Sequence, residues 1–394
     1  MNLPAPHPLL RVRTGEEARV SFAELFFDLV YVFAVTQLSH LLLAHLAPLG
    51  AAQTLLLWFA VWLGWQYTCW VSNWFDPEKL PIRLLLFGVM LLALPMAAAI
   101  PQAFGARGLL FALCYAGIQF GRSLVVVLLL GRHHPLSPNF RRILGWTAIS
   151  AVFWVAGGLV DGTARLALWA VAVLCEYVSP MFGFRLPGLG RSRTSDWTIE
   201  GGHLAERCQL FVIVALGECL LITGATLAQA GHWEGLQVLA FLLAFLSSLA
   251  LWWIYFDTSS KDASHTIAHA ADPGRMGAYF HYLHVLIVAG LIVVAVASEL
   301  VIAHPHGEAS VITLAVLLGG PALYLFGNGL FRRVVYGGFP RSHVAGLLVL
   351  ALLVLAAHCE LLVLASLVLG VLIAVAVWDG CSQRRTPTAH APGH

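Results

Sequence analysis

Charge is scarce in this sequence of 394 residues, because Asp, Glu, Lys and Arg together make up only 11% of it. A soluble domain carries about 25% charged residues, so the composition argues against a soluble globular protein. The formal net charge is +2, which is too small to indicate a nucleic-acid partner, and we expect none.

The sequence also lacks the motifs of common enzyme classes and metal sites. Its seven cysteines form no Cys-x-x-Cys pair, so we predict no disulfide framework. It has no P-loop, no Gly-x-Gly-x-x-Gly after a strand and no His-Glu-x-x-His. We therefore assign no catalytic residue, no metal and no cofactor.

Hydrophobic residues, in contrast, make up 59% of the chain, and successive apolar runs reach the roughly 20 residues that a helix needs to cross a bilayer. The sequence predicts an all-α polytopic membrane protein with about twelve transmembrane helices. The predicted helices are 22–46, 53–75, 81–100, 108–130, 142–160, 164–184, 204–229, 235–257, 276–300, 309–331, 342–358 and 361–380. The weakest predicted boundary is the polar triplet 358–360.

The basic residues predict the orientation of these helices, because cytoplasmic loops collect Lys and Arg. With the N-terminus inside, all but four of the 22 basic residues lie in cytoplasmic segments. Arg107 and Arg165 lie outside, and Arg122 and Arg207 lie within helices. We therefore predict that the N- and C-termini are both cytoplasmic.

Similar short motifs recur about 182 residues apart and predict an internal repeat. Ala23-Glu24 recurs as Ala205-Glu206, and Phe75-Asp76 recurs as Phe256-Asp257. Six helices per repeat would give two parallel six-helix repeats related by an axis along the membrane normal. The predicted organisation is a cytoplasmic segment (1–20), the first repeat (21–185), a cytoplasmic linker (186–203), the second repeat (204–380) and a disordered cytoplasmic tail (381–394).

Two acids in the first predicted helix are the strongest functional signal. A carboxylate within the hydrocarbon span costs roughly 2.5 to 3.5 kcal/mol, so Glu24 and Asp28 should face protein or water. Their spacing of four residues places both on one helix face. For Glu24 the alternative is a structural cap of the helix N-terminus. For Asp28 the alternative is a structural network between helices.

The seventh predicted helix carries Glu206 near its start and Glu218 twelve residues deeper. Glu24, Asp28, Glu206 and Glu218 are therefore our candidates for an ion or proton pathway. A structural role for Glu218, as a neutral hydrogen-bond donor or an ion-pair partner, stays open. We expect Gln37, Arg122, Glu176, His203 and Arg207 to support the pathway or to form internal ion pairs. For Arg207, extension to the membrane interface is another alternative.

The other polar and aromatic residues of the predicted helices and loops have simpler explanations. His265 and His269 would bind a metal only if their segment is helical. His281 and His284 are typical of core or interfacial histidines. The tryptophans of the second predicted helix suit an interfacial belt or helix packing.

Two stretches resemble the bacterial low temperature requirement A (LtrA) family. They are Glu24-Leu-Phe-Phe-Asp28-Leu-Val-Tyr-Val-Phe-Ala and Glu206-Arg207 with Leu216-Gly217-Glu218, and Asn73-Trp-Phe-Asp76 also fits. The resemblance covers nearly the whole chain and implies a bacterial membrane protein whose family is named for a cold-growth phenotype. The first helix is more distantly similar to potassium channels with a Phe-Ser-Asp signature, although Phe27 replaces the serine.

Three functions remain open at this point. The first is a channel or transporter that moves a small cation or protons along a polar interior lined by acids of the first and seventh helices. The second is an intramembrane enzyme that acts on lipid and holds a metal at Glu24 and Asp28. The third is a sensor or scaffold linked to low-temperature growth. We expect membrane lipid as a partner, leave a homodimer open, and place the protein in the bacterial inner (cytoplasmic) membrane.

Overall fold

A computed structural model describes residues 7–11, 19–193, 199–229, 233–257, 266–267, 270 and 272–385 of the chain. Over these residues the fold is all-α, with twelve α-helices, of which eleven are long and apolar enough to cross a membrane. They are α1 (Phe22–Ala44), α2 (Pro48–Trp74), α3 (Leu80–Ala99), α4 (Gly108–Leu130), α5 (Ser137–Leu159), α6 (Gly162–Met181), α7 (Gly201–Gln229), α8 (Gly235–Phe256), α10 (Pro273–Ala303), α11 (Val311–Tyr336), α12 (Arg341–Leu352) and α13 (Leu361–Arg385).

The predicted helix positions are confirmed over the described residues. The 3-10 segment η3 (Leu353–Ala356) extends α12, and together they form the shorter apolar helix 341–356. The predicted break at 358–360 is present, since the chain turns there before α13 begins. Helix α13 continues to Arg385, so residues 381–385, which the sequence prediction placed in the tail, are helical. Residues 386–394 lie outside the described residues.

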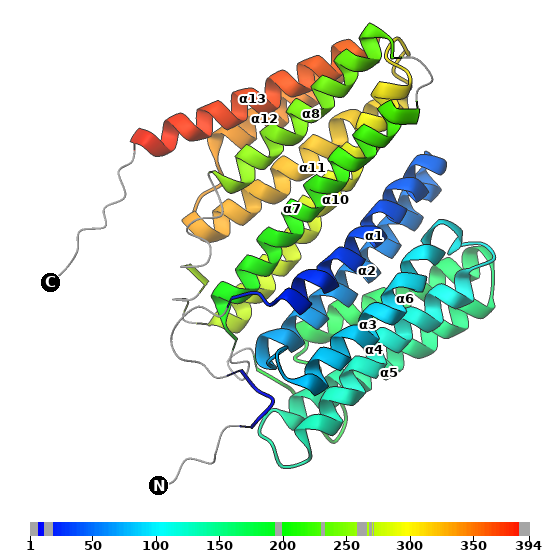
Figure 1. Cartoon of the computed structure of the whole chain (residues 1–394), viewed down its shortest axis with the longest axis vertical. Helices are drawn as coiled ribbons and strands as arrows, with labels where there is room; N and C mark the ends of the chain where they lie inside the picture. The colour runs from blue at the N-terminus through cyan, green and yellow to red at the C-terminus, as the bar shows by residue number, and fades with distance from the viewer. Residues whose placement is uncertain are drawn as a thin grey trace, which may run out of the picture. The chain divides into compact units, whose positions relative to one another are not determined.

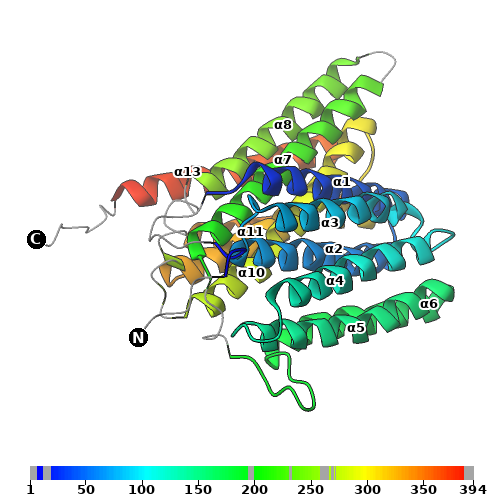
Figure 2. The same cartoon turned by 60° about the horizontal axis from the view of Figure 1, so that its bottom comes forward.

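The chain divides into two compact units. Unit 1 contains residues 1–211 and 267–281, and unit 2 contains residues 212–266 and 282–394. In unit 1, α1 packs against α2 and α3, and α3 to α6 pack in sequence order (Figures 1 and 2). In unit 2, α13 packs against α8 and α12, and α12 packs against α11. The two six-helix repeats and the cytoplasmic termini stay predictions.

Helix α1 begins at a capping box, which sets the position of its first acid. The backbone N–H of Glu24 donates to the Ser21 hydroxyl, and the backbone N–H of Ser21 donates to the Glu24 carboxylate at 2.9 Å. Reciprocal bonds of this kind satisfy N–H groups that a helix leaves unpaired at its start. The capping role considered for Glu24 is therefore confirmed.

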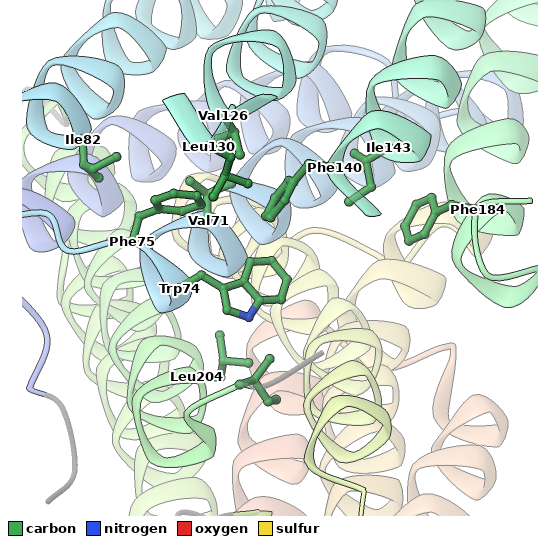
Figure 3. Packing of buried hydrophobic residues seen from close by; sticks show 11 residues of the cluster. Val71, Trp74, Phe75, Ile82, Val126, Leu130, Phe140, Ile143, Phe184 and Leu204 are labelled. Atoms are coloured by element: carbon green, nitrogen blue, oxygen red, sulfur yellow. The ribbon is translucent and has the colours of Figure 1, made fainter. Parts of the chain in front are cut away.

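Buried hydrophobic residues form a cluster around the end of α2 (Figure 3). Its buried members are Val71, Trp74, Phe75, Ile82, Val126, Leu130, Phe140, Ile143, Phe184, Ile199 and Leu204. Leu9 and Leu10 pack against this cluster, and the N–H of Arg11 donates to the Trp74 carbonyl at 2.9 Å. The segment is thereby fixed beside α2, which brings the Arg11 side chain to the start of α1.

Candidate functional site

Glu24 is fully buried in unit 1 and binds three cationic or ionisable side chains. Its Oε2 lies 3.0 Å from Arg11 Nη2, and its Oε1 lies 3.1 Å from Arg207 Nη1. Oε1 is also 2.9 Å from His203 Nε2. The carboxylate thus joins the N-terminal segment, α1 and α7.

Asp28, one turn further along α1, is 1% exposed and binds the same guanidinium group. Its Oδ1 accepts from Arg207 Nη2 at 2.5 Å and from Trp65 Nε1 at 2.7 Å. Glu24 and Asp28 therefore share one side of α1, as their spacing predicted, and Arg207 contacts both.

His203 and Arg207 reach these acids from one face of α7, four residues apart. The ring of His203 is held by Asn73 Nδ2, which lies 3.1 Å from His203 Nδ1. Asn73 in turn exchanges hydrogen bonds with the backbone of Glu200 at 2.8 and 2.9 Å. The start of α7 is therefore tied to the end of α2 as well as to α1.

These side chains form one ion-pair cluster, which consists of Arg11, Glu24, Asp28, Trp65, Asn73, His203 and Arg207. Its charges balance, because the carboxylates of Glu24 and Asp28 face the guanidinium groups of Arg11 and Arg207. Arg207 is fully buried, and its guanidinium lies 5.6 Å from the Phe27 ring centroid and 5.9 Å from that of Trp65. These distances suit cation–π attraction. Arg207 therefore forms internal ion pairs with Glu24 and Asp28. The alternative interpretation, in which its side chain extends to the membrane interface, is wrong.

Several buried polar atoms of unit 1 have no hydrogen-bond partner among the described residues. They include Asp28 Oδ2, Tyr31 Oη, Trp62 Nε1, Gln66 Oε1, Trp70 Nε1 and Arg207 Nε. Trp62, Gln66 and Trp70 follow one another at intervals of four residues on α2, so they share one face of that helix. Unpaired polar groups cost free energy in a membrane interior and call for an explanation.

A second buried network in unit 1 contains two more of the predicted residues. Glu176 accepts four hydrogen bonds, from Ser150, Trp154, Tyr115 and Gln119. Arg122 Nη2 donates to Gln119 Oε1 at 2.5 Å, so Gln119 links Arg122 to Glu176. A carboxylate with four donors is held firmly, which suits a structural role for this network.

The remaining predicted residues lie elsewhere. Gln37 on α1 and Glu206 on α7 are half-buried. Glu218 is 4% exposed and belongs to unit 2. His265 and His269 lie outside the described residues. Over the part of the chain that is described, no group of three or more His, Cys, Asp or Glu side chains is placed to hold a metal.

Sequence reasoning did not identify three members of the ion-pair cluster. Arg11 was counted only as a cytoplasmic basic residue, Trp65 only as one of several aromatic residues, and Asn73 only as part of a family motif. A signal was present for Asn73, since a buried amide near a helix end is typical of a side chain that binds a neighbouring backbone.

Unit 2 contains a separate buried polar cluster that the sequence did not indicate. Arg332 Nη1 lies 2.5 Å from Asp379 Oδ2, and the Ser342 hydroxyl donates to the same carboxylate. His343 Nε2 lies 2.9 Å from Asn328 Oδ1. These bonds join α11, α12 and α13.

The apolar helices and the buried ion pairs define a multi-pass α-helical membrane protein, whose lipid-facing helices imply contact with membrane lipid. Residues 19–378 match the family described as bacterial low temperature requirement A protein (LtrA), so the chain belongs to the LtrA family. It is similar to the uncharacterized protein RA0937 of Rhizobium meliloti (strain 1021), with 39% identity over 94% of this chain and 91% of that protein. No solved structure matches the chain significantly.

Proposed function

We propose that the protein is a transporter of the bacterial cytoplasmic membrane that moves protons, alone or together with a small solute. The observation that carries this proposal is the state of Asp28. Its Oδ1 is bound by Arg207 and Trp65, while Oδ2 is buried without a partner among the described residues. A desolvated carboxylate oxygen without a donor is costly, and protonation of Asp28 removes the charge.

The charge balance favours protons over metal cations as the transported ion. Arg11 and Arg207 already neutralise Glu24 and Asp28, so a metal cation that enters the cluster meets two guanidinium groups. A proton, in contrast, can bind a carboxylate oxygen or His203 without a coordination shell. Of the two ions expected from the sequence, a small cation or a proton, we therefore propose the proton.

Protonation at this site would also change how the helices are held together. The ion pairs of Arg207 with Glu24 and Asp28 connect α7 to α1. When Asp28 becomes neutral, its Coulomb attraction to Arg207 disappears and the connection weakens. Proton binding is thereby coupled to a change in helix packing, which is what a transporter requires.

Glu218 is the second acid to which we assign proton binding. It is buried within a membrane-spanning helix, where an ionisable residue is a candidate for a functional role. Glu206 and Gln37 are half-buried and are proposed to line the route near the membrane surface. The lipid-modifying enzyme receives less support, because the two carboxylates that would hold its metal are bound by arginines.

A proton-flux assay tests this function. The purified protein is reconstituted into liposomes with a trapped pH-sensitive dye, and a potassium diffusion potential is imposed with valinomycin. We expect flux above that of empty liposomes. Asp28→Asn should lower it by about 100-fold, the order of magnitude that a positioned proton-transfer group contributes.

The matched control is Glu78→Gln, which removes an exposed acid paired with Arg83 at 2.8 Å and should leave the flux unchanged. Glu218→Gln provides a second test if Asp28→Asn does not fold. If the wild-type protein gives no proton flux under either sign of the imposed membrane potential, the result would contradict the proposal and favour a sensor or scaffold. Unchanged flux in both acid variants would remove these acids from the route.

A further inference from the structure

Three arginines of unit 1 lie where the loop after α6 packs against the start of α5. This group, which we call the arginine surface, consists of Arg142 of α5 and Arg185 and Arg191 of the loop. Trp146 of α5 donates its indole N–H to the Arg185 carbonyl at 3.2 Å. Arg142 donates to the hydroxyl of Ser192, which follows Arg191, at 3.0 Å. These two contacts bring the three arginines to one part of the protein surface.

The guanidinium group of Arg142 is held in place by uncharged oxygens. Its Nε donates to the Leu189 carbonyl at 2.7 Å, and its Nη1 donates to Asn139 Oδ1 at 2.6 Å and to the Ser192 hydroxyl. Nη2 has no hydrogen-bond partner among the described residues. The positive charge is therefore positioned but not neutralised, and Nη2 can donate to a bound anion.

The neighbouring sequence supplies no carboxylate to this surface. Residues 131–193 contain two acids, Asp161 and Glu176. Asp161 pairs with Arg165 at 2.6 Å at the opposite ends of α5 and α6, and Glu176 is buried among four hydrogen-bond donors. In contrast, Arg83 in the loop after α2 pairs with Glu78 at 2.8 Å. Among the described residues, no carboxylate pairs with any arginine of the arginine surface.

The arginine surface lies at the ends of two membrane-spanning helices, beside exposed apolar side chains. Met181 ends α6 and Phe182 follows it, and they are 73% and 65% exposed. Trp146 is half-buried one helical turn from Arg142. Tryptophan is enriched where a spanning helix meets the headgroups, and exposed apolar residues beside it contact the acyl chains. The three arginines are therefore expected at the depth of the phospholipid headgroups.

We propose that the arginine surface binds an anionic phospholipid, such as phosphatidylglycerol, in the leaflet next to the start of α5. Arg142 Nη2 donates to a phosphate oxygen, and Arg185 and Arg191 supply further positive charge. The acyl chains lie beside Met181 and Phe182. Basic clusters at the ends of membrane helices attract anionic headgroups in this way. The inference does not depend on proton transport.

Native mass spectrometry of the full-length protein in detergent tests the proposal. The protein is titrated with phosphatidylglycerol, and the apparent Kd of the first bound lipid is measured. We expect tighter binding than for phosphatidylethanolamine with the same acyl chains. Arg185→Gln/Arg191→Gln should weaken the binding of phosphatidylglycerol by about 25-fold, which is about fivefold for each arginine near an anionic headgroup. The matched control is Arg83→Gln, which removes an arginine that is already paired and should leave the affinity unchanged.

Arg142→Lys separates a defined site from general attraction by charge. The variant keeps the positive charge but loses the planar fork that positions Nη2. We expect weaker binding of phosphatidylglycerol, and unchanged affinity would overturn a defined site. Both exposed arginines of the loop make no side-chain hydrogen bond among the described residues, so Arg185→Gln/Arg191→Gln should fold and carries the test if Arg142→Lys does not.

Photo-crosslinking locates the bound lipid. A phosphatidylglycerol with a diazirine in its acyl chain should crosslink to Trp146, Met181 and Phe182 in the wild-type protein and much less in Arg185→Gln/Arg191→Gln. Equal affinity of that variant and the wild type would overturn the proposal. Displacement of the lipid by equimolar glycerol phosphate would assign the surface to a soluble phosphate compound instead, and displacement by an oligoglutamate peptide would assign it to an acidic protein segment.

Discussion

Arg207 is the residue on which the ion-pair cluster depends most. It is fully buried and binds both Glu24 and Asp28, and Nη1 lies 3.5 Å from the Ser72 hydroxyl. Burying a guanidinium group is expensive, and the two carboxylates offset that cost only while all three side chains are present. The cluster is therefore sensitive to the loss of any one charge.

We predict that Arg207→Gln destabilises the protein by about 3–5 kcal/mol, because it leaves buried carboxylates without their partner. The double variant Asp28→Asn/Arg207→Gln should lose less than the sum of the two single variants, because it removes both members of the pair. Thermal unfolding in detergent measures all three.

Arg83→Gln is the control for this comparison of single and double variants. It breaks the exposed pair with Glu78 and should change stability by about 1 kcal/mol or less. Additive losses in the double variant would mean that Asp28 and Arg207 are not coupled.

Packing between helices depends on glycine where α10 and α11 meet in unit 2. A Cβ atom at Gly290 would lie 2.6 Å from the Tyr324 backbone nitrogen, and one at Gly320 would lie 2.9 Å from the Val294 backbone nitrogen. These contacts are with backbone, which cannot move aside as a flexible side chain can. Small residues at such crossings let membrane helices approach closely.

Neighbouring glycines of α11 should therefore respond to alanine in opposite ways. Gly320→Ala should destabilise the protein by about 1–3 kcal/mol through overpacking against α10. At Gly319 a Cβ meets nothing within 4 Å, so Gly319→Ala should be neutral or should stabilise the helix by up to about 1 kcal/mol. Thermal unfolding of the two variants decides this, and equal effects would contradict close packing at Gly320.

The number of membrane crossings in the whole chain depends on the shortest helix. Helix α12 with η3 spans 341–356, about 26 Å at the rises of an α-helix and a 3-10 helix, against a hydrocarbon core of about 30 Å. If it crosses, the described residues form twelve spans, and residues 19 and 385 lie on the same side. If it does not, the described residues form eleven spans, which place residues 19 and 385 on opposite sides.

We predict that Cys381, which is exposed near the end of α13, lies on the cytoplasmic side with the N-terminus. A membrane-impermeant maleimide should label it in inside-out vesicles and not in intact cells, in a variant with Cys175 and Cys359 changed to serine. An N-terminal tag should show the same sidedness. Labelling of Cys381 from outside would mean that helix α12 does not cross.

Part of the site was predictable because its members follow local rules. The four-residue spacing of Glu24 and Asp28 predicts a shared face in any helix, and a buried acid predicts a polar partner. The identity of that partner was not predictable, since Arg207 is separated from Asp28 by 179 positions. The ion pair of Arg11 with Glu24 was not predictable either, because it depends on the packing of Leu9 and Leu10 against the end of α2.

The sequence by itself determined the membrane class, the family and the position of nearly every helix. The membrane class and the helix positions depend on apolar runs and capping residues that act over neighbouring positions, and the family depends on short motifs that can be read directly from the sequence. Only the tertiary structure decided that the acids of α1 are neutralised by arginines, and that Arg122 reaches Glu176 through Gln119. Ion pairs between helices are formed by packing distant segments, and spacing along one helix carries no information about which charge a neighbouring helix will present.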